Sequence, residues 1–233
     1  MKLAPAPDVA PRNGTRDRHR RVWVVIAAIE VVVATLIVVL DLFIPTVLVL
    51  GLAALSLVVR RPGPASLGFR RVPHPWRMAG QVLVVMMVWS VLQLGVFMPV
   101  LNHVTGTKQD LSGFADLQGS LGLLAAYLLA TWTLAALGEE TVFRGYLQVR
   151  IAEVVGPGRA GTVVAVAFTS LLFGILHSEQ GLIGVLVVAL DAVLFSVLKL
   201  RFRSLWAAVL AHGFNNTLGL VAFFFVGPIY GFW

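Results

Sequence analysis

Three short motifs carry the residues of this chain that could do chemistry. Each motif has two residues four positions apart, in the pairs Glu140 and Arg144, Phe173 and His177, and His212 and Asn216. Residues at this spacing share one face of a helix, so Glu140 and Arg144 can neutralise each other. The preceding Glu139 points roughly 100° away. The pattern therefore leaves Glu139 as an acid with no partner on its own helix.

The side chains in these motifs are suited to hydrolysis of a peptide bond by activated water. The chain has no Cys, and no Ser stands in the sequence context of a nucleophile elbow. A carboxylate in an apolar cavity is a suitable general base for water. Asn and His side chains can donate hydrogen bonds to the oxyanion, and removal of one such donor typically costs about 3 to 4 kcal/mol of transition-state stabilisation.

Each motif also has a structural interpretation. Glu140 with Arg144 can form an ion pair at a membrane interface, and His177 can be an interfacial histidine. His212 with Asn216 can form a hydrogen-bond clamp between helices. All three structural interpretations would have to hold together for the chain to carry no site.

Two other functions stay open beside hydrolysis. One is a proton-coupled transporter that uses Glu139, His177 and Asp191 as a relay, although an odd number of spans without inverted repeats counts against it. The other is a catalytically silent immunity or scaffold protein. The change Glu139→Ala separates them, because a protease loses cleavage, a scaffold keeps its phenotype and a transporter loses pH-coupled flux. Glu30, Asp41 and Asp191 are predicted to be packing, interface or hydration residues, with the cavity as an alternative for Glu30 and Asp191.

Composition places the motifs in a membrane. Hydrophobic residues make up 58% of the 233 residues and charged residues only 12%, and the mean hydropathy is +0.89. These values exclude a soluble globular domain and indicate a polytopic membrane protein. We expect an all-α transmembrane helix bundle of about seven spans. The predicted spans are Val22–Leu40, Leu42–Val59, Trp76–Val100, Gln118–Val155, Ala160–His177, Gly181–Leu200 and Ser204–Val226.

Three parts of the chain are predicted: a disordered basic tail at 1–21, N-terminal transmembrane spans at 22–116 and a membrane core with all three motifs at 117–233. With the tail inside and the loops alternating, every Lys and Arg except Lys108 falls on the inner side. This positive-inside bias predicts an inside N-terminus. It also explains the net charge of +7 without a nucleic-acid partner.

The first two motifs are predicted to face each other. The spans Gln118–Val155 and Ala160–His177 form a helical hairpin about the Gly and Pro residues at 156–158. Glu139 and His177 lie the same number of positions from the end of this break, on opposite arms. Two helical arms therefore place the acid and the imidazole at one depth.

These three motifs, in this order on successive apolar segments, resemble the CPBP family of intramembrane proteases. That family includes the prenyl-protein (CAAX) endopeptidases and the bacterial Abi proteins linked to bacteriocin processing or immunity. The resemblance covers roughly Leu117 to Val226. The Ser-Leu-Trp sequence at 204–206 is similar to the family's usual lead-in to His212, but Arg203 stands where a glycine is usual.

The resemblance implies a role for each matched residue. Glu139 would be the general base that activates water, and His177 would position that water. His212 and Asn216 would donate hydrogen bonds to the oxyanion. Glu140 is counted with the catalytic residues and would, with Arg144, hold the site in place, while Phe173 would support the site by packing beside His177. The implied activity is endoproteolysis of a membrane-associated peptide or protein, of CAAX type or related to bacteriocins and immunity, by an integral protein of a bacterial cell membrane.

A metal ion is an alternative to the metal-free mechanism. Glu139, His177 and His212 could form a zinc site with an open fourth position. However, the chain has no His-Glu-x-x-His sequence, and the amide of Asn216 suits an oxyanion hole better than a zinc shell. The favoured interpretation therefore requires no cofactor.

Overall fold

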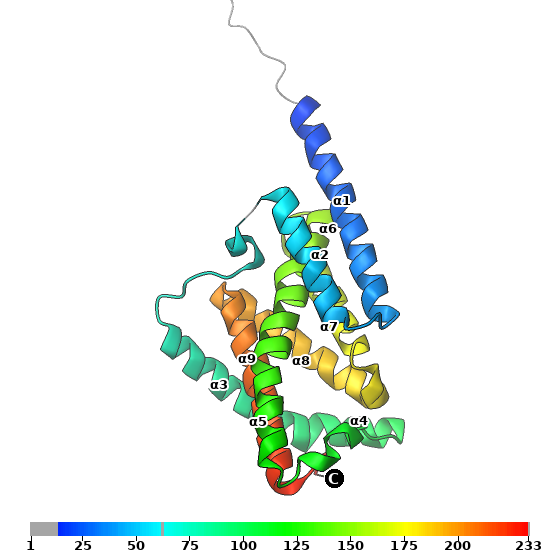
Figure 1. Ribbon diagram of the computed structural model, residues 1–233, viewed down its shortest axis with the longest axis vertical. Helices are drawn as coiled ribbons and strands as arrows, with labels where there is room; N and C mark the ends of the chain where they lie inside the picture. Colours follow the sequence, from blue (N-terminus) through cyan, green and yellow to red (C-terminus); the bar gives the residue numbers. More distant parts are fainter. Residues whose placement is uncertain (1–13, 62, 233) are drawn as a thin grey trace, which may run out of the picture.

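The computed structural model describes residues 14–61 and 63–232, and it is built of helices with no strand in this part of the chain (Figure 1). The all-α fold class predicted from the sequence is confirmed. The longer helices are α1 Gly14–Val39, α2 Pro45–Arg60, α3 Pro75–Leu92, α4 Met98–Thr105, α5 Leu121–Ala130, α6 Gln148–Val155, α7 Arg159–Ile175, α8 Gly181–Phe202 and α9 Leu205–Val226.

Five helical stretches are long and apolar enough to cross a membrane, and two apolar helices, α2 and α7, are shorter. The long stretches are Arg20–Val39, Pro75–Thr105, Leu121–Val155, Ser178–Phe202 and Leu205–Val226. Together these seven helices match the seven predicted spans in order and approximate bounds. Helices are the favoured form in lipid because they satisfy their own backbone hydrogen bonds. The orientation with the N-terminus inside stays a prediction.

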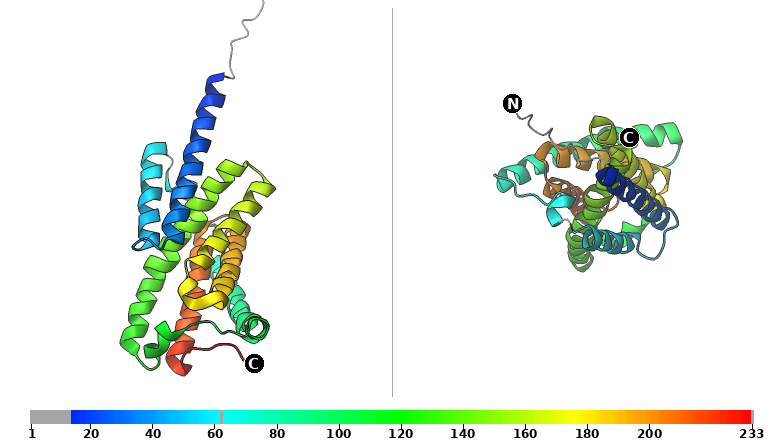
Figure 2. Two further views of the ribbon diagram at one scale, coloured as in Figure 1. Left: turned by 90° about the vertical axis from the view of Figure 1, so that its right-hand side faces the viewer. Right: turned by 90° about the horizontal axis from the view of Figure 1, so that it is seen from above.

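The first helix begins earlier than the sequence analysis predicted. Residues 14–21 were predicted to belong to a disordered tail, but α1 starts at Gly14 and includes the basic run from Arg16 to Arg21. This stretch lacks proline, and arginine is a good helix former, so the apolar helix continues into it. The rest of the predicted tail, residues 1–13, lies outside the described residues. Figure 2 shows α1 and α2 side by side at this end of the molecule.

One long helical stretch, Leu121–Val155, forms the first arm of the predicted hairpin. It is not a uniform α-helix, because Thr131–Glu139 (η4) and Thr141–Leu147 (η5) are π-helical. Such π segments are frequent at functional sites. The hairpin turns where predicted, since α6 ends at Val155 and α7 begins at Arg159. Gly156 and Gly158 have φ of 116° and 108°, which favours glycine at both positions.

Three basic residues that the topology analysis assigned to the inner side lie within helices, and two of them are buried. Arg144 and Arg150 are almost fully buried, and each has a carboxylate partner. The side chain of Lys199 donates to the backbone carbonyl of Arg144 and to Gln148 Oε1, the latter at 3.1 Å. Burial is tolerated here because each cationic group finds an anion or a carbonyl oxygen.

The end of the bundle opposite the start of α1 is closed by short elements. A π-helical segment, Gln93–Phe97 (η2), joins α3 to α4, and α4 lies across this end in Figure 1. The 3₁₀ helix Ser112–Leu117 (η3) follows, and its Phe114 packs edge-on against Phe223 of α9 at 5.7 Å between ring centroids. These elements form one end of the cavity described below.

The connection from α8 to α9 explains the departure at Arg203. Arg203 follows α8 with φ 53° and ψ 31°, a left-handed conformation. Glycine adopts this conformation without strain, whereas other residues do so at a cost of about 1 to 2 kcal/mol. The backbone at position 203 therefore suits the glycine that is usual there in the CPBP family, which this chain resembles. Leu205 N donates to Gly68 O at 2.8 Å, which fixes the start of α9.

Candidate active site

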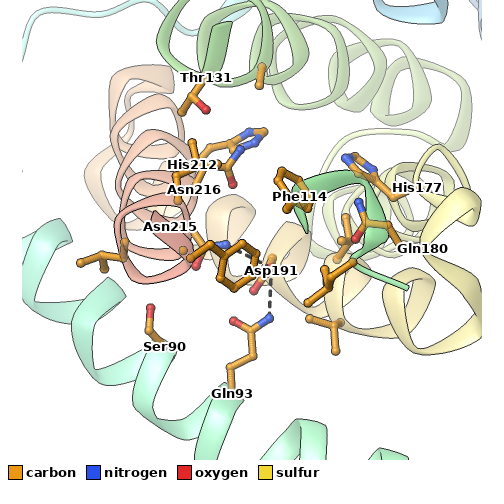
Figure 3. A pocket seen from close by; sticks show the side chains of 18 of the residues that line it. Ser90, Gln93, Phe114, Thr131, His177, Gln180, Asp191, His212, Asn215 and Asn216 are labelled. Carbon is orange, nitrogen blue, oxygen red and sulfur yellow. Dashed lines mark hydrogen bonds between the residues drawn. The ribbon is translucent and has the colours of Figure 1, made fainter. Parts of the chain in front are cut away.

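A cavity of about 430 Å³ lies among α3, η2, α4, η3, α5, η4, α7, α8 and α9. The residues of the three sequence motifs that line its wall are Glu139, Phe173, His177, His212 and Asn216. Figure 3 shows His177 on one side of the cavity and His212 with Asn216 on the other. The remaining lining is largely apolar. The bundle thus brings polar groups from three separate segments to one hollow.

Glu139 stands at the last position of the π-helical segment η4 and lines the cavity. Its Oε2 atom is buried and has no hydrogen-bond partner among the described residues. The Oε2 atom of Glu139 is therefore able to accept a hydrogen bond from a molecule in the cavity.

Glu140 lies behind the cavity wall and not on it. Arg144 Nη1 lies 3.0 Å from Glu140 Oε1, and both side chains are fully buried. His212 Nδ1 lies 2.9 Å from the same oxygen. The predicted pair of Glu140 with Arg144 is thus present, and it extends to a third group. The catalytic role predicted for Glu140 stays a prediction, and its contacts with Arg144 and His212 would allow it to orient the His212 ring.

Aromatic rings fix the two histidines and the buried arginine. The Arg144 guanidinium lies 4.4 Å from the Phe173 ring centroid. The His212 ring stacks on Phe195 at 5.2 Å with an interplanar angle of 20°. The predicted packing of Phe173 beside His177 is present, with ring centroids 4.9 Å apart. These contacts leave His212 little freedom to rotate.

His177 follows the end of α7 and is oriented by its own chain. Its Nδ1 atom lies 3.0 Å from the backbone carbonyl oxygen of Phe173. A carbonyl oxygen only accepts hydrogen bonds, so Nδ1 carries the proton in this contact. The Nε2 atom of the neutral ring is then an acceptor. His177 therefore can accept a hydrogen bond from a water molecule in the cavity.

Asp191 is the cavity residue that the sequence analysis undervalued. It lies near the middle of α8 and lines the same cavity, where it accepts hydrogen bonds from Trp89 Nε1 at 2.5 Å and from Asn215 Nδ2 at 3.2 Å. Gln93 Nε2 lies 3.5 Å away on the same carboxylate (Figure 3). A carboxylate in the middle of a predicted span was the signal that could have identified it. Glu30, by contrast, does not line this cavity.

Comparison with known proteins agrees with this geometry. Residues 121–218 match the family model described as Type II CAAX prenyl endopeptidase Rce1-like. The match makes this part of the chain similar to that family and supports the resemblance drawn from the motifs. The match contains all the motif residues named above, and the Rce1-like family implies a protease embedded in the membrane. A search of curated proteins and a search of solved structures each found no match.

The residues of the candidate site do not form a ready set of metal ligands. In residues 14–61 and 63–232, no three His, Asp or Glu side chains are grouped so that they could hold a metal ion. Glu139, His177 and His212 share a cavity but not such a cluster. The zinc alternative stays a prediction, and no catalytic step below runs through a metal.

Proposed function

We propose that this protein is an intramembrane endopeptidase that hydrolyses a peptide bond of a membrane-associated peptide or protein. The observation that carries this proposal is the Glu139 carboxylate, which has a buried oxygen without a protein partner in a cavity that it shares with His177, His212 and Asn216. Similarity to a CAAX endopeptidase family supports the reaction class.

The nucleophile is a water molecule held between Glu139 and His177. Glu139 accepts one proton of this water, and the acceptor Nε2 of His177 accepts a hydrogen bond from the other. The water oxygen forms a bond to the carbonyl carbon of the substrate as its proton passes to Glu139. General bases of this kind contribute a factor of about 10² to 10⁴ in rate.

The oxyanion is stabilised from the opposite side of the cavity. Asn216 has an amide N–H₂ that can donate directly. His212 already donates from Nδ1 to Glu140, so donation from Nε2 requires the doubly protonated ring. Glu140, which also binds Arg144, contacts that ring directly through Oε1. This arrangement gives Glu140 a reason to be buried beside His212.

Collapse of the intermediate completes the reaction. The carbon–nitrogen bond breaks, and the proton that Glu139 took from the water passes to the departing amine nitrogen. Glu139 is then a carboxylate again, and the products are a carboxylic acid and an amine, which become carboxylate and ammonium when the proton passes between them. The cycle needs no oxidant and no second substrate besides water.

The apolar wall of the cavity supports a substrate that reaches the site from the bilayer. Leu94, Met98, Leu111 and Phe114 line the end formed by η2, α4 and η3. We propose a CAAX-type or a bacteriocin- or immunity-related peptide as the substrate, in a bacterial cell membrane. The two substrate types differ in whether a prenyl group is required.

Cleavage of quenched fluorescent peptides by the purified full-length protein in detergent tests the proposal. Prenylated and unprenylated peptides are compared, each with and without a chelator. Wild type is expected to cleave in both chelator conditions, whereas Glu139→Gln and His177→Ala are expected to lose cleavage. Glu153→Gln is a matched control because it changes a carboxylate outside the cavity.

Two results would count against this mechanism. Undiminished cleavage by Glu139→Gln would remove the proposed base, and no cleavage of any peptide by a folded wild-type protein would favour the scaffold. Loss of activity with chelator, restored by zinc, would replace the metal-free reaction with the zinc alternative.

A further inference from the structure

We propose that Asp191 forms a second subsite in the cavity, which binds a cationic side chain of the substrate close to the scissile peptide bond. The proposal rests on the proposed function, because it assigns the kind of substrate that the same cavity selects. It goes beyond that function because no sequence motif described above includes Asp191.

The buried acids of the described chain show why Asp191 is unusual. Three acidic residues are buried: Glu30, Glu140 and Asp191. Glu30 is ion-paired with arginine side chains, and Glu140 is ion-paired with Arg144. The hydrogen-bond donors on Asp191 are neutral groups of a tryptophan and two carboxamides. Asp191 is thus the buried carboxylate whose charge no bound cationic side chain balances.

Apart from the histidines His177 and His212, the groups on the cavity wall that carry charge are acids. Among its lining residues, Glu139 and Asp191 are the acids, and neither a lysine nor an arginine is present. The positive charge of Arg144 acts on Asp191, but its guanidinium is bound to Glu140 and does not line the cavity. The cavity therefore favours a positive group and disfavours a negative one.

The Asp191 carboxylate can accept further hydrogen bonds. Each carboxylate oxygen has two lone pairs, and Oδ1 receives a single donor, Trp89 Nε1. Oδ2 receives Asn215 Nδ2 at 3.2 Å and Gln93 Nε2 at a long 3.5 Å. An ammonium or guanidinium group can therefore add to this carboxylate without displacing a partner. In Figure 3, Asp191 lies between Gln93 of η2 and Asn215 of α9, at the centre of the cavity.

The surrounding wall suits the long side chain of a lysine or an arginine. Val187 and Val188 precede Asp191 on α8 and line the cavity, as do Leu94 and Met98. Apolar surface of this kind packs against methylene groups while the charged head reaches the acid. A carboxylate without a bound counter-charge costs free energy inside a membrane. A substrate cation therefore binds more strongly to such a carboxylate there than at a solvated surface.

Binding of short apolar peptides to the purified full-length protein in detergent tests the subsite. The peptides are acetylated and amidated, and they differ at one position, which is lysine, norleucine or glutamate. The varied position is moved along the peptide to cover both sides of the bond that is cut. Affinity is measured by microscale thermophoresis, and cleavage of the same peptides is followed by mass spectrometry.

For wild type, the best lysine peptide is expected to bind about tenfold more tightly than its norleucine counterpart, and the glutamate peptide more weakly than both. In Asp191→Asn the lysine advantage is expected to fall to within about twofold, with affinity for the norleucine peptide unchanged. Glu179→Gln is the control, because Glu179 is an exposed acid that does not line the cavity. This variant should keep the full lysine preference.

Equal binding of lysine and norleucine peptides by wild type would overturn the proposal, even if Asp191→Asn did not fold. An undiminished lysine preference in Asp191→Asn would overturn it as well. Failure of the proposed function appears differently, as intact peptides after incubation or as cleavage that survives in Glu139→Gln. The binding measurement does not depend on cleavage, so the two outcomes are separable.

Discussion

Two buried charge clusters in this bundle use the same residue types in opposite ways. In the first, Arg60 and Arg150 connect α2 and α6 to Glu30 of α1 and to Glu153. The four ion-pair distances lie between 2.9 and 3.3 Å, and two positive charges meet two negative ones. We call this the paired cluster.

The second cluster surrounds the cavity and is not balanced. Glu140 is bound by Arg144 and His212, but Glu139 and Asp191 face the cavity without a cationic partner bound to them. We call this the cavity cluster. A carboxylate that is ion-paired with an arginine holds helices together, whereas one without a cationic partner is free to accept a proton or bind a ligand. Burial alone does not distinguish the two kinds of carboxylate.

The largest expected effect is at Glu139. Replacing it with Gln should lower the cleavage rate by about 10²- to 10⁴-fold. Stability should be unchanged or slightly higher, because the change removes a charge that has no partner on its buried Oε2 atom. Peptide cleavage and thermal unfolding of the same preparation measure both quantities. A clear loss of stability would mean that Glu139 belongs with the paired carboxylates.

Arg144→Gln should lower both stability and activity. Glu140 would keep its charge and lose its guanidinium, and breaking a buried ion pair in this way costs about 3 to 5 kcal/mol of unfolding free energy. The orientation of the His212 ring should also be disturbed, because Arg144 and His212 both contact Oε1 of Glu140. If thermal unfolding shows a stable Arg144→Gln protein with normal cleavage, the positioning role of Glu140 is wrong.

In the paired cluster, Glu30→Gln should reduce stability without a direct effect on the reaction. Arg60 and Arg150 both keep Glu153 as a partner. The loss should therefore be smaller than at Arg144, about 1.5 to 3 kcal/mol, as for hydrogen bonds to charged groups. The measurement is the unfolding midpoint together with cleavage at a temperature below it. A rate loss as large as that of Glu139→Gln would contradict the division between the two clusters.

The smallest effect is expected for Glu153→Gln. The Glu153 side chain is 26% exposed, compared with 10% for Glu30. Water replaces part of its interaction with the two arginines, and exposed ion pairs contribute about 0 to 1 kcal/mol. Unfolding midpoints of Glu153→Gln and Glu30→Gln measured side by side test this order. A larger loss at Glu153 would show that α6, and not α1, is held most strongly by the paired cluster.

Much of the helical architecture could be predicted because lipid imposes strong constraints on the sequence. Apolar length identified the membrane helices, and the glycines at 156–158 located the hairpin turn. The four-residue spacing identified Glu140 with Arg144 as a pair. The start of α1 could not be placed from apolar length, because a helix that leaves the bilayer continues through any residues with good helix propensity.

Other features depend on contacts between segments that are distant in the chain. Sequence spacing could not show that Glu140 binds His212, since 72 positions separate them. It also could not show that Arg150, which was predicted on the inner side, pairs with Glu30 of α1, or that η4 and η5 take π geometry next to Glu139. Each of these features depends on how the helices pack, because a buried charged group pairs with a group of opposite charge on whichever helix lies beside it.

The sequence by itself determined which residues are able to do chemistry and that they lie on membrane helices, because residue type, apolar length and helical spacing are local properties. Only the tertiary structure decided which of the acids are neutralised. A carboxylate on one helix is balanced or left unbalanced by the helix that packs beside it, and that neighbour separates Glu30 and Glu140 from Glu139 and Asp191.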